Sequence, residues 1–489
     1  MASTAEPSAM TNTTIQTDRP SRGGSEEFRH GEYLLPEAEP QRTRWPRASD
    51  HHTPKRVWLG LLGVILTFMA VTTFIAVKTP AYESADEPGH VQNIETLVSG
   101  HWYGMNAPCR PNPTIGLLQC SGDEAQQAPL YYLLFAGWQK AINQPALPPF
   151  NTRHVSTNPD FLFGTSGVFK SHSAADLRFL LWLRLPNIFL GALTVLITFL
   201  AVRLISRDSW TPLVAASFLA FLPRMMFLWP FVTNDNLVNL LGAIFLYVAL
   251  RYALAPNRGR MAVVGVVYGL LLLTKLSTAP LLLVVVALAC FVPGWKRRAE
   301  LLGVGAASAL LVSGWFFIQN SVRYGGPLAS GVTSRYLSAI GALGIPAGQR
   351  YTVPDPLRFI FIQVPQRIEQ TFWYLSDWNQ FHWSWAVNLL FTLVLLGTLV
   401  GLFRSRVNRR IFAILVVVSI ASFLSVWGVA LHSYYQARYA FVGIPALAGL
   451  VALGVERWKL PTRFLLPAMG LIGTLVAIQV DVVSIHWNY

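Results

Sequence analysis

The sequence has little charge, and it has least of the negative kind. Only 13% of its 489 residues are Asp, Glu, Lys or Arg, and 24 acidic residues stand against 38 basic ones. Charged side chains cover the surfaces of soluble proteins, so a soluble chain of this length would carry more of them. The low charge excludes an ordinary soluble enzyme. The net charge of +14 does not indicate nucleic-acid binding, because much of the Lys and Arg lies in short clusters between apolar runs.

Cysteine is also scarce, with three residues in the chain, so at most one intrachain disulfide can form. Cys109 and Cys120 lie in a long polar segment. They are predicted to form a disulfide if that segment faces an oxidising compartment, and two free thiols are the alternative. Cys290 lies in an apolar run and is predicted to be a small buried hydrophobic residue.

Long apolar runs take the place of the missing charge. Apolar residues make up 53% of the chain, and several runs pass the roughly 18–20 residues that a helix needs to cross a bilayer. The sequence therefore predicts an all-α polytopic membrane protein. The first run, residues 57–77, starts too late and is too long for a signal peptide, so it is predicted to be a retained span. Residues 1–55 lack an apolar period and are predicted to be a disordered cytoplasmic tail before a membrane domain of residues 56–489.

Basic clusters separate the apolar runs. They lie at residues 203–208, 258–260, 295–300, 404–410 and 456–463. Cytoplasmic loops are enriched in Lys and Arg, so we place all five clusters in the cytoplasm with the N-terminus. The runs between them then alternate as about eleven spans and leave the C-terminus outside.

One uninterrupted apolar run, residues 261–294, has a basic cluster at each end. Both ends belong in the cytoplasm under the same rule, so the run must cross the membrane twice. The turn is predicted at residues 274–277, which puts Lys275 near the outer face.

Two long loops are predicted to face outward, at about residues 78–176 and 320–382. Within them, the segments 129–141 and 355–370 are apolar but too short to span a bilayer. They are predicted to be helices that lie at the membrane interface, anchored by aromatic side chains.

The predicted outer ends of the spans hold most of the polar residues that could carry chemistry. These candidates are Asp86, Glu87, Glu124, Gln126, Gln127, Tyr131, Tyr132, Asn234, Asp235, Lys275, Asn320, Arg323, Tyr324, Asp377, Trp378, His432, Tyr434, Tyr435, Gln436 and Arg438. Charged groups near a bilayer are costly and tend to mark functional sites. Carboxylates can take a proton from an attacking hydroxyl, and Arg or Lys can hold a departing phosphate. The set is therefore predicted to serve a reaction between a lipid-borne anionic donor and a polar acceptor.

Several candidates also have a simpler local explanation. Asp86 stands two residues before a proline and can cap a short helix. Asn234 and Asp235 can form an ordinary turn, and Lys275 and Arg438 can extend to the interface from the ends of spans. His90 follows Asp86 by four residues, so both could face one metal ion on a helix, although a lone His in a loop is usually not a ligand.

Seven segments in order along the chain carry a family resemblance. They are SADEPGH (84–90), DEAQQAPLYYLL (123–134), FVTNDNLVNLL (231–241), YGLLLLTKLS (268–277), GWFFIQNSVRYGGPL (314–328), TFWYLSDW (371–378) and QARYAFVGIPALAGL (436–450). In this order they resemble the GT-C superfamily of membrane glycosyltransferases, which use polyprenyl-phosphate-linked sugars. The resemblance covers residues 57–460 and includes bacterial relatives of protein O-mannosyltransferases and of aminoarabinose transferases, and it is closest to a poorly characterised branch. The series is more specific for the fold than for the substrate.

The resemblance implies an inverting glycosyltransferase in the cytoplasmic membrane, with its site on the outer face. It would move a sugar from a polyprenyl-phosphate donor to an envelope glycan, lipid or protein. Asp86 would be the general base, Glu87 would orient the acceptor, and Lys275 and Arg438 would bind the donor phosphate. Asp235 would be a second acidic residue, and with Asp86 it could ligate Mg²⁺ or Mn²⁺, which some members use. The other expected substrate-binding residues are Asn234, Gln127, Tyr131, Tyr132, Tyr324 and Tyr435.

The chain departs from the family pattern at three positions. Gln126 stands where His is common, Ala128 where Pro is common, and Gln319 where Arg is common. These departures put contacts around the site in doubt and leave the Asp-Glu pair unaffected.

Two other functions fit the same composition. A transporter or flippase for a lipid-linked sugar would commonly show internal repeats and polar groups near the midplane of the membrane. No convincing repeat is present, and the polar residues gather at the ends of the runs. A non-catalytic envelope scaffold on the same fold is the other alternative, but it would not need Asp86, Glu87, Asp235 and Arg438 together.

Overall fold

The computed structural model describes most of the chain beyond the N-terminal segment. The described residues are 53–79, 84, 86–105, 110–111, 118–119, 124–144, 174–333, 355–376, 381–404, 408–430, 436–458, 468–473 and 475. All of them belong to one compact unit, Ala48–Tyr489. Residues 1–52 of the predicted tail lie outside the described residues, as do Cys109 and Cys120 of the predicted disulfide.

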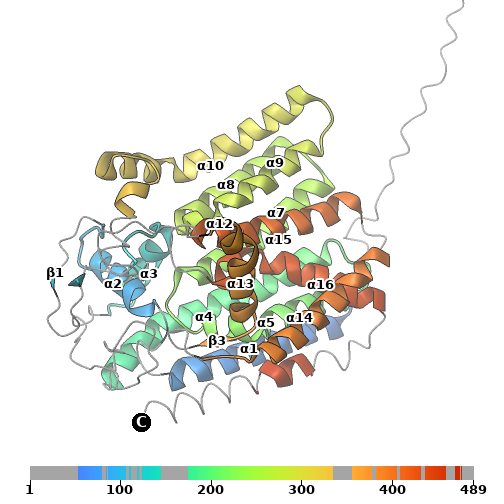
Figure 1. The fold of residues 1–489 in the computed structure, drawn as a ribbon, viewed down its shortest axis with the longest axis horizontal. Coiled ribbons are helices and arrows are strands. Elements are labelled where there is room, and N and C mark those ends of the chain that lie inside the picture. Colours follow the sequence, from blue (N-terminus) through green and yellow to red (C-terminus); the bar gives the residue numbers. More distant parts are fainter. Residues whose placement is uncertain are drawn as a thin grey trace, which may run out of the picture. The chain divides into compact units, whose positions relative to one another are not determined.

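Helices make up nearly all of the described secondary structure (Figure 1). They are α1 (Lys55–Lys78), α2 (Glu87–Val98), α3 (Leu130–Ala141), α4 (Ala174–Arg203), α5 (Thr211–Ala220), α6 (Pro223–Leu228), α7 (Asn234–Leu254), α8 (Arg258–Thr274), η2 (Leu276–Leu281), α9 (Leu282–Cys290), α10 (Trp295–Tyr324), α12 (Pro356–Arg358), η3 (Phe359–Gln363), α13 (Val364–Phe372), α14 (Trp385–Val400), η5 (Gly401–Arg404), α15 (Arg409–Ala430), η6 (Ala437–Gly443) and α16 (Ile444–Trp458). The strands are two short antiparallel pairs, β1 (Arg110–Pro111) with β2 (Leu118–Gln119) and β3 (Leu375–Ser376) with β4 (Phe381–His382). The predicted all-α membrane class is confirmed.

Among the described residues, seven helices are long and apolar enough to cross a membrane. They are Lys55–Lys78, Arg178–Arg203, Asn234–Leu254, Trp295–Tyr324, Trp385–Phe403, Arg409–Ala430 and Ala437–Trp458. The predicted number of about eleven spans is not confirmed. Two apolar runs are broken into shorter helices, and most of residues 459–489 lie outside the described residues.

Two such breaks have clear local causes. After α5 ends at Ala220, the next helix begins at Pro223, which has no N–H group to continue the preceding helix. In the run predicted to cross twice, α8 ends at Thr274, and Lys275 takes an extended backbone before helix resumes at Leu276. The break therefore lies within the predicted turn, and neither half reaches the length of the seven longer helices.

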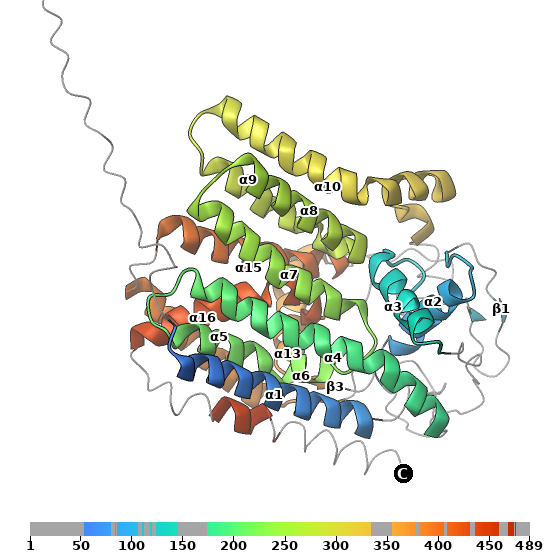
Figure 2. The ribbon, with the colours of Figure 1, turned by 180° about the vertical axis from the view of Figure 1, so that it is seen from behind.

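The long helices pack around α7 and α16. Along one side of α7, α8 packs against α9 and α10, and on the other side α4 packs against α1 and α5 (Figures 1 and 2). Helix α16 contacts α5, α7, α14 and α15. Its span is 89% buried inside the protein, whereas the spans of α10 and α14 are 28% and 11% buried. The two exposed helices are apolar, so their free faces suit contact with lipid.

Helices α8 and α10 approach closely because both carry small residues where they cross. A Cβ atom at Gly265 of α8 would lie 2.2 Å from the carbonyl oxygen of Gly305 in α10, and one at Gly269 would lie 2.6 Å from that of Ala309. Small residues at such crossings let helix backbones pack tightly in membranes, where the hydrophobic effect between helices is weak.

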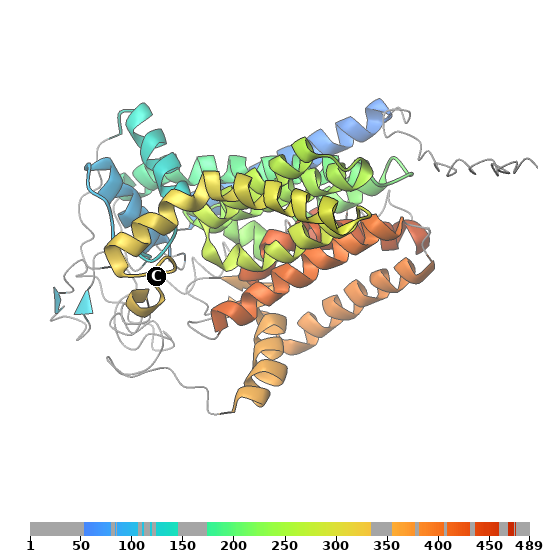
Figure 3. The ribbon, with the colours of Figure 1, turned by 90° about the horizontal axis from the view of Figure 1, so that it is seen from above.

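Short helices cover one end of the long ones. Helices α2 and α3 pack against each other beyond the ends of the bundle, and α13 contacts η6 and α15 (Figure 3). The predicted interfacial segments 129–141 and 355–370 are helical, as α3 and as the succession α12, η3 and α13. Their position at the membrane interface stays a prediction.

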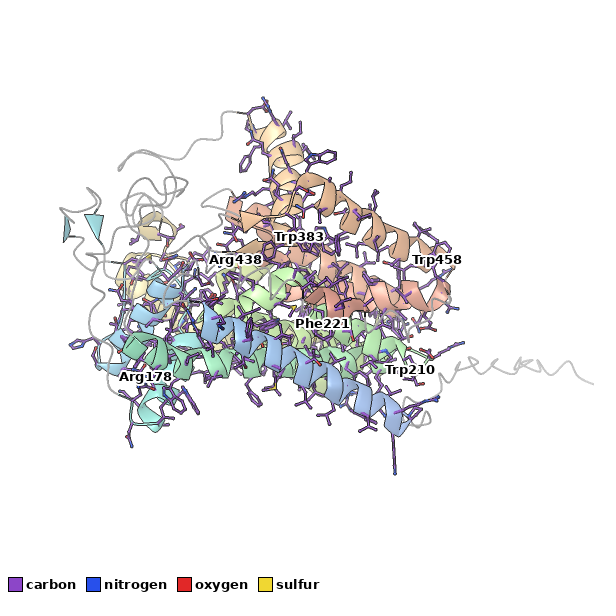
Figure 4. The ribbon with its side chains drawn as sticks, turned by 90° about the horizontal axis from the view of Figure 1, so that it is seen from below. Arg178, Trp210, Phe221, Trp383, Arg438 and Trp458 are labelled. Atoms are coloured by element: carbon purple, nitrogen blue, oxygen red, sulfur yellow. The ribbon has the colours of Figure 1, made fainter. Side chains whose placement is uncertain are left out.

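The described residues of the basic clusters lie toward the opposite end of the bundle. Trp210 and Trp458 lie toward that end, whereas Arg438 lies toward the other (Figure 4). At the basic end, Arg258 and Arg297 both pair with Glu300, joining the starts of α8 and α10. The two ends of the bundle thus differ in charge, as the sequence predicts. The side of the membrane that each end faces stays a prediction.

The predicted burial of Cys290 is wrong. In α9, the positions that face inward are Val284, Val285, Leu288 and Ala289, and the next residue falls on the outward face of the helix. Cys290 is therefore an exposed free cysteine at the end of α9.

Candidate active site

Four charged side chains from separate elements meet at the end of the bundle that carries α2 and α3. The Arg438 guanidinium donates to the Asp86 carboxylate and lies 3.6 Å from Asp235, measured from Nη1 to Oδ2. The Lys275 ammonium pairs with the other oxygen of Asp235. We call Asp86, Asp235, Lys275 and Arg438 the charge cluster. The structure brings together these four residues predicted from the sequence, and their catalytic roles stay predictions.

The members of the charge cluster differ in burial. The side chains of Asp235, Lys275 and Arg438 are 3%, 7% and 8% exposed, whereas that of Asp86 is 26% exposed. Charges buried to this degree are unlike residues that extend to the membrane interface from span ends. Asp86 is the member that a molecule from outside can reach most easily.

Asp235 is positioned by the start of α7. Thr233 caps this helix, and its hydroxyl accepts a hydrogen bond from the Asp235 N–H at 3.3 Å. A carboxylate in the first turn is favoured by the positive end of the helix dipole. Asn234 and Asp235 are therefore the first residues of a capped helix rather than an isolated turn.

Lys275 and Arg438 share one aromatic face. Lys275 follows the last residue of α8, where the helix dipole favours a cation. Its ammonium lies 4.7 Å from the centre of the Tyr439 ring, and the Arg438 guanidinium carbon lies 5.5 Å from the same centre. The ring face attracts both cations and helps to hold them side by side.

The helix that carries Arg438 is held in place by a close approach to α7. A Cβ atom at Gly242 would lie 2.1 Å from the carbonyl oxygen of Val442, so only glycine allows η6 to sit this near. From the other side, the hydroxyl of Thr371 in α13 accepts a hydrogen bond of 2.8 Å from the Ala437 N–H. These contacts fix the backbone from which Arg438 extends.

Asp86 has an uncommon backbone conformation, with φ of 68° in the left-handed region. Such residues cluster at functional sites, because the surroundings must hold the strained conformation. Asp86 occupies the N-cap position of α2, but its side chain makes no capping hydrogen bond and reaches Arg438 instead. Burial alone raises the pKa of Asp86, but the Arg438 guanidinium outweighs it and holds the pKa below its usual range. The carboxylate is therefore ionised at neutral pH.

Glu87 takes part in a different, fully buried network. Its two oxygens accept hydrogen bonds of 3.0 and 2.7 Å from Arg184, and the Val232 N–H adds a third at 3.0 Å. Arg184 also donates to the carbonyl oxygens of Ala76 and Thr79 at 2.7 and 2.8 Å. The network ties α4 to the end of α1 and to the segment before α7. Both oxygens of Glu87 are thus occupied inside the protein, and its predicted contact with an acceptor stays a prediction.

A chain of amides links Glu124 to the charge cluster. Gln127 donates to Glu124 Oε2 at 2.7 Å and accepts from Asn234 at 3.1 Å, while Gln126 donates to the same Glu124 oxygen at 3.2 Å. Burial, together with the nearby Asp86 carboxylate, raises the pKa of Glu124 to about 8. Glu124 therefore holds a proton at neutral pH, in contrast to Asp86.

Two tyrosines predicted to bind substrate are instead packed inside the protein. Tyr131 donates to Asn187 at 3.0 Å, and the Tyr132 hydroxyl is hydrogen-bonded to His90 Nδ1 at 2.8 Å, with both rings fully buried. Burial lowers the pKa of His90 to about 3, so this His is neutral. The residues join α2 and α3 to α4, and in this arrangement they give substrate no access.

Of the two remaining predicted substrate contacts, Tyr324 forms a hydrogen bond inside the protein and Tyr435 is not described. The Tyr324 hydroxyl accepts a 3.3 Å hydrogen bond from the Met105 N–H and ties the end of α10 to the segment after α2. Tyr435 lies outside the described residues.

Some buried polar atoms at the site have no hydrogen-bond partner among the described residues. They are Asn234 Oδ1, Asp235 Oδ2, Arg438 Nε and Gln126 Oε1. Buried polar groups are normally paired, and unpaired ones call for an explanation. Asn234 Oδ1 and Asp235 Oδ2 are acceptors and Arg438 Nε is a donor, so these three residues can still form hydrogen bonds.

The charge cluster does not suit a metal ion. No group of three or more His, Cys, Asp or Glu side chains within the described ranges is arranged to hold one. The carboxylates of Asp86 and Asp235, predicted as ligands, both face the cations of Arg438 and Lys275. The positive charges of Arg438 and Lys275 would repel a divalent cation that approached the carboxylate oxygens of Asp86 and Asp235.

Two buried arginines near the site were missed by the sequence reasoning. Arg184 supports Glu87, and Arg224 donates to Gln436 Oε1 at 2.8 Å, two residues from Arg438. Arg224 is the sole charged residue of the run 211–232, and Arg184 interrupts another apolar run. An ionised residue inside such a run is costly and marks a paired or functional group, which is the signal that could have found both.

Comparison with solved structures gives three examples of similarity. ArnT from Cupriavidus metallidurans in the apo state aligns with a TM-score of 0.48 and 16% identity, over 84% of this chain and 62% of that one. The Archaeoglobus fulgidus oligosaccharyltransferase in the apo form aligns at 0.45 and 16%, over 88% and 56%. The S. cerevisiae protein O-mannosyltransferase Pmt1-Pmt2 complex aligns at 0.38 and 14%, over 60% and 38%.

The chain thus spans less than two thirds of each of these proteins. They belong to the GT-C superfamily, the one that the seven sequence motifs resemble. No protein-family model matches the chain, and no curated protein sequence does. All three TM-scores lie below 0.5.

Proposed function

We propose that the chain is an inverting glycosyltransferase that moves a sugar from a polyprenyl-phosphate donor to a cell-envelope acceptor. The observation that carries the proposal is the charge cluster, in which two carboxylates and two cations from four separate elements meet. A carboxylate and a cation side by side are what a displacement at a sugar phosphate requires, a base for the acceptor and a partner for the departing phosphate. The family resemblance of the seven motifs supports the same reaction.

The location of the cluster supports a lipid-borne donor. Asp86 follows the end of α1, Asp235 lies at the start of α7, and Arg438 lies at the start of the Ala437–Trp458 span. The ends of spanning helices lie at the depth of lipid head groups. A phosphate attached to a polyprenyl chain would reach Arg438 and Lys275 without leaving the membrane.

The reaction can be written with each group in one role. The acceptor hydroxyl oxygen attacks the anomeric carbon, and its proton passes to the Asp86 carboxylate. The bond between that carbon and the phosphate oxygen breaks, and the phosphate keeps the electron pair. The additional negative charge on the phosphate is stabilised by Arg438 and Lys275. A single displacement of this kind inverts the anomeric carbon, as the family resemblance implies.

The unpaired polar atoms support a sugar as the transferred group. Asn234 Oδ1 and Asp235 Oδ2 are acceptors that sugar hydroxyls would satisfy, and Arg438 Nε is a donor for a phosphate oxygen. A hydroxyl-rich group beside an anion matches this mixture of acceptors and cations.

The proposal also specifies the side of the membrane that the charge cluster faces. Trp458, which lies in the last basic cluster, and Trp210, two residues after the first, lie toward the opposite end of the bundle from Arg438 (Figure 4). If the basic clusters face the cytoplasm, as the positive-inside rule predicts, the charge cluster faces outward in the cytoplasmic membrane. The acceptor would then be an envelope glycan, lipid or protein.

The proposal is tested with the full chain in nanodiscs. Polyprenyl-phosphate sugars are supplied with envelope extract, and mass spectrometry follows the release of polyprenyl phosphate and the gain of sugar by acceptors. The wild-type chain is expected to release the lipid phosphate only with acceptor present. Asp86→Asn should lower the rate about 10²–10⁴-fold, the contribution typical of a general base.

Glu300→Gln, which removes one negative charge at the basic end, serves as the matched control and should transfer at the wild-type rate. Wild-type activity retained by Asp86→Asn would remove Asp86 from the mechanism. Movement of intact lipid-linked sugar across the bilayer without bond cleavage would favour a flippase instead.

A further inference from the structure

The charge cluster is closed on itself. Arg438 pairs with Asp86 and lies near Asp235, and Lys275 pairs with Asp235, so two negative and two positive charges neutralise one another. A phosphate entering this buried group would lie beside both carboxylates. Anions held side by side away from water repel strongly, so binding favours the displacement of one carboxylate from Arg438.

The structure indicates which carboxylate gives way. Asp235 is 3% exposed, lies in the first turn of α7 and keeps Lys275 as a partner even if Arg438 turns away. Asp86 is 26% exposed, precedes α2 and has Arg438 as its one ion-pair partner within the described residues. Its backbone is left-handed, a conformation uncommon outside glycine. Asp86 is thus the more easily displaced of the two.

We infer that Asp86 occupies the place on Arg438 that the donor phosphate takes, so that donor binding transfers the guanidinium from the carboxylate to the phosphate. The Asp86 carboxylate acts as an internal substitute for the phosphate while the donor is absent. This inference rests on the proposed function, because it identifies the donor phosphate as the competing anion.

The exchange would couple donor binding to the strength of the base. A carboxylate that loses its cation and stays partly buried binds a proton more tightly, so Asp86 becomes a better base only once the phosphate is bound. It then takes the proton of the acceptor hydroxyl, while the departing phosphate keeps the electron pair of the broken bond. When the lipid phosphate leaves, Arg438 returns to Asp86 and the proton is released to water.

Two variants test the exchange without disturbing the backbone. Asp86→Asn and Asp86→Gly both remove the charge, and Asn and Gly both tolerate the positive φ of this position. The affinity of the full-length chain in detergent for farnesyl phosphate is measured by titration calorimetry. Both variants are expected to bind farnesyl phosphate roughly tenfold more tightly than the wild type, because Arg438 no longer has a competing carboxylate.

Further arms identify the ligand. Farnesol, which has no phosphate, should bind the wild type and both variants equally. The increase in affinity from wild type to variant should be smaller for inorganic phosphate than for farnesyl phosphate. An equal increase would assign the place on Arg438 to free phosphate instead of a lipid head group. Arg438→Gln should weaken binding of farnesyl phosphate and cancel the gain when combined with Asp86→Asn. Glu300→Gln is the control for the change in net charge and should bind as the wild type does.

Unchanged or weaker binding in both Asp86→Asn and Asp86→Gly would overturn the exchange. Its failure can be told apart from failure of the proposed function. If the wild type transfers sugar and the variants show no gain in affinity, the exchange is wrong and the transferase stands. If the gain is found but the wild type transfers no sugar from any donor, the phosphate site stands and the transferase is wrong.

Discussion

The two ends of the helix bundle use charge in opposite ways. At the basic end, Arg258 and Arg297 pair with Glu300, and the side chains of Arg258 and Glu300 are 68% and 31% exposed. At the other end, the pairs Glu87–Arg184 and Asp235–Lys275 are almost completely buried. Exposed pairs contribute little to stability, and the basic end can be understood from membrane topology alone.

The buried pairs require a different explanation. Moving charges out of water is costly, and apolar residues of similar size often stabilise a protein as well or better. The Glu87–Arg184 pair is satisfied on all sides by hydrogen bonds, including two to backbone carbonyls, as expected of a framework. In the charge cluster, Asp235 Oδ2 and Arg438 Nε have no hydrogen-bond partner among the described residues, although Asp235 Oδ2 lies 3.6 Å from Arg438 Nη1. The exposed pairs of the basic end thus differ both from the fully hydrogen-bonded Glu87–Arg184 pair and from the buried charge cluster, in which some atoms lack a hydrogen bond.

The largest effect on stability is expected from breaking the Glu87–Arg184 pair. Glu87→Gln leaves the buried Arg184 without its carboxylate, which should lower the free energy of unfolding by about 3–5 kcal/mol. Thermal unfolding in detergent measures the change. Glu87→Gln combined with Arg184→Met should recover part of the loss, because no charge is then buried alone. A shift as small as that of an exposed pair would contradict the distinction between the two ends.

The next effect concerns the support of Arg438. In Gly242→Ala, the new Cβ would approach the Val442 carbonyl and push η6 away from α7. We expect a loss of about 1–3 kcal/mol in stability, typical of overpacking, with weaker binding of farnesyl phosphate. Gly314→Ala in α10 is the matched control, since nothing lies within 4 Å of its added Cβ. If both variants bind farnesyl phosphate like the wild type, Gly242 does not position Arg438.

A third effect depends on pH. The folded protein raises the pKa of Glu124 from its ordinary 4.5 to about 8, so the folded state keeps a proton that the unfolded state loses across this window. The stability due to protonated Glu124 is complete below pH 4.5 and is lost as pH rises to about 8. Relative to neutral Glu124→Gln, the wild type should therefore lose about 1–3 kcal/mol between pH 5 and pH 8. If the free energy of unfolding changes with pH in the same way in both proteins, Glu124 has an ordinary pKa.

The smallest effect is expected at the basic end. Glu300→Gln removes the shared partner of Arg258 and Arg297, both of which are exposed. Water and salt screen such pairs, so the Tm in detergent should not change measurably. A large decrease in Tm would mean that the exposed pair is structural, and the contrast between the two ends would disappear.

The fold class could be predicted because it depends on local patterns. Apolar runs and basic clusters were enough to identify a helical membrane protein, and the break at Lys275 was expected from charges at both ends of one run. The number of about eleven spans is not confirmed, because composition alone does not show which apolar helices reach the length of a bilayer. The interruption before Pro223 and the shortness of α8 depend on local backbone geometry.

The site could be predicted in part. Asp86, Asp235, Lys275 and Arg438 were found as polar residues at predicted outer ends, and the structure brings them together. Glu87, Tyr131 and Tyr132 were predicted from the same ends, yet they are hydrogen-bonded inside the framework. Glu87 follows Asp86 directly and carries the same carboxylate, so no pattern in the sequence separates this site residue from its support.

The sequence by itself determined that this protein is a helical membrane protein and which ends of its helices carry basic clusters, because insertion depends on hydrophobicity and charge read locally along the chain. Only the tertiary structure decided which acids meet which cations. Asp86 and Arg438 are separated by 352 residues and Glu87 and Arg184 by 97. Such pairs form through the packing of helices that are distant in sequence, where the low dielectric makes the choice of partner decisive.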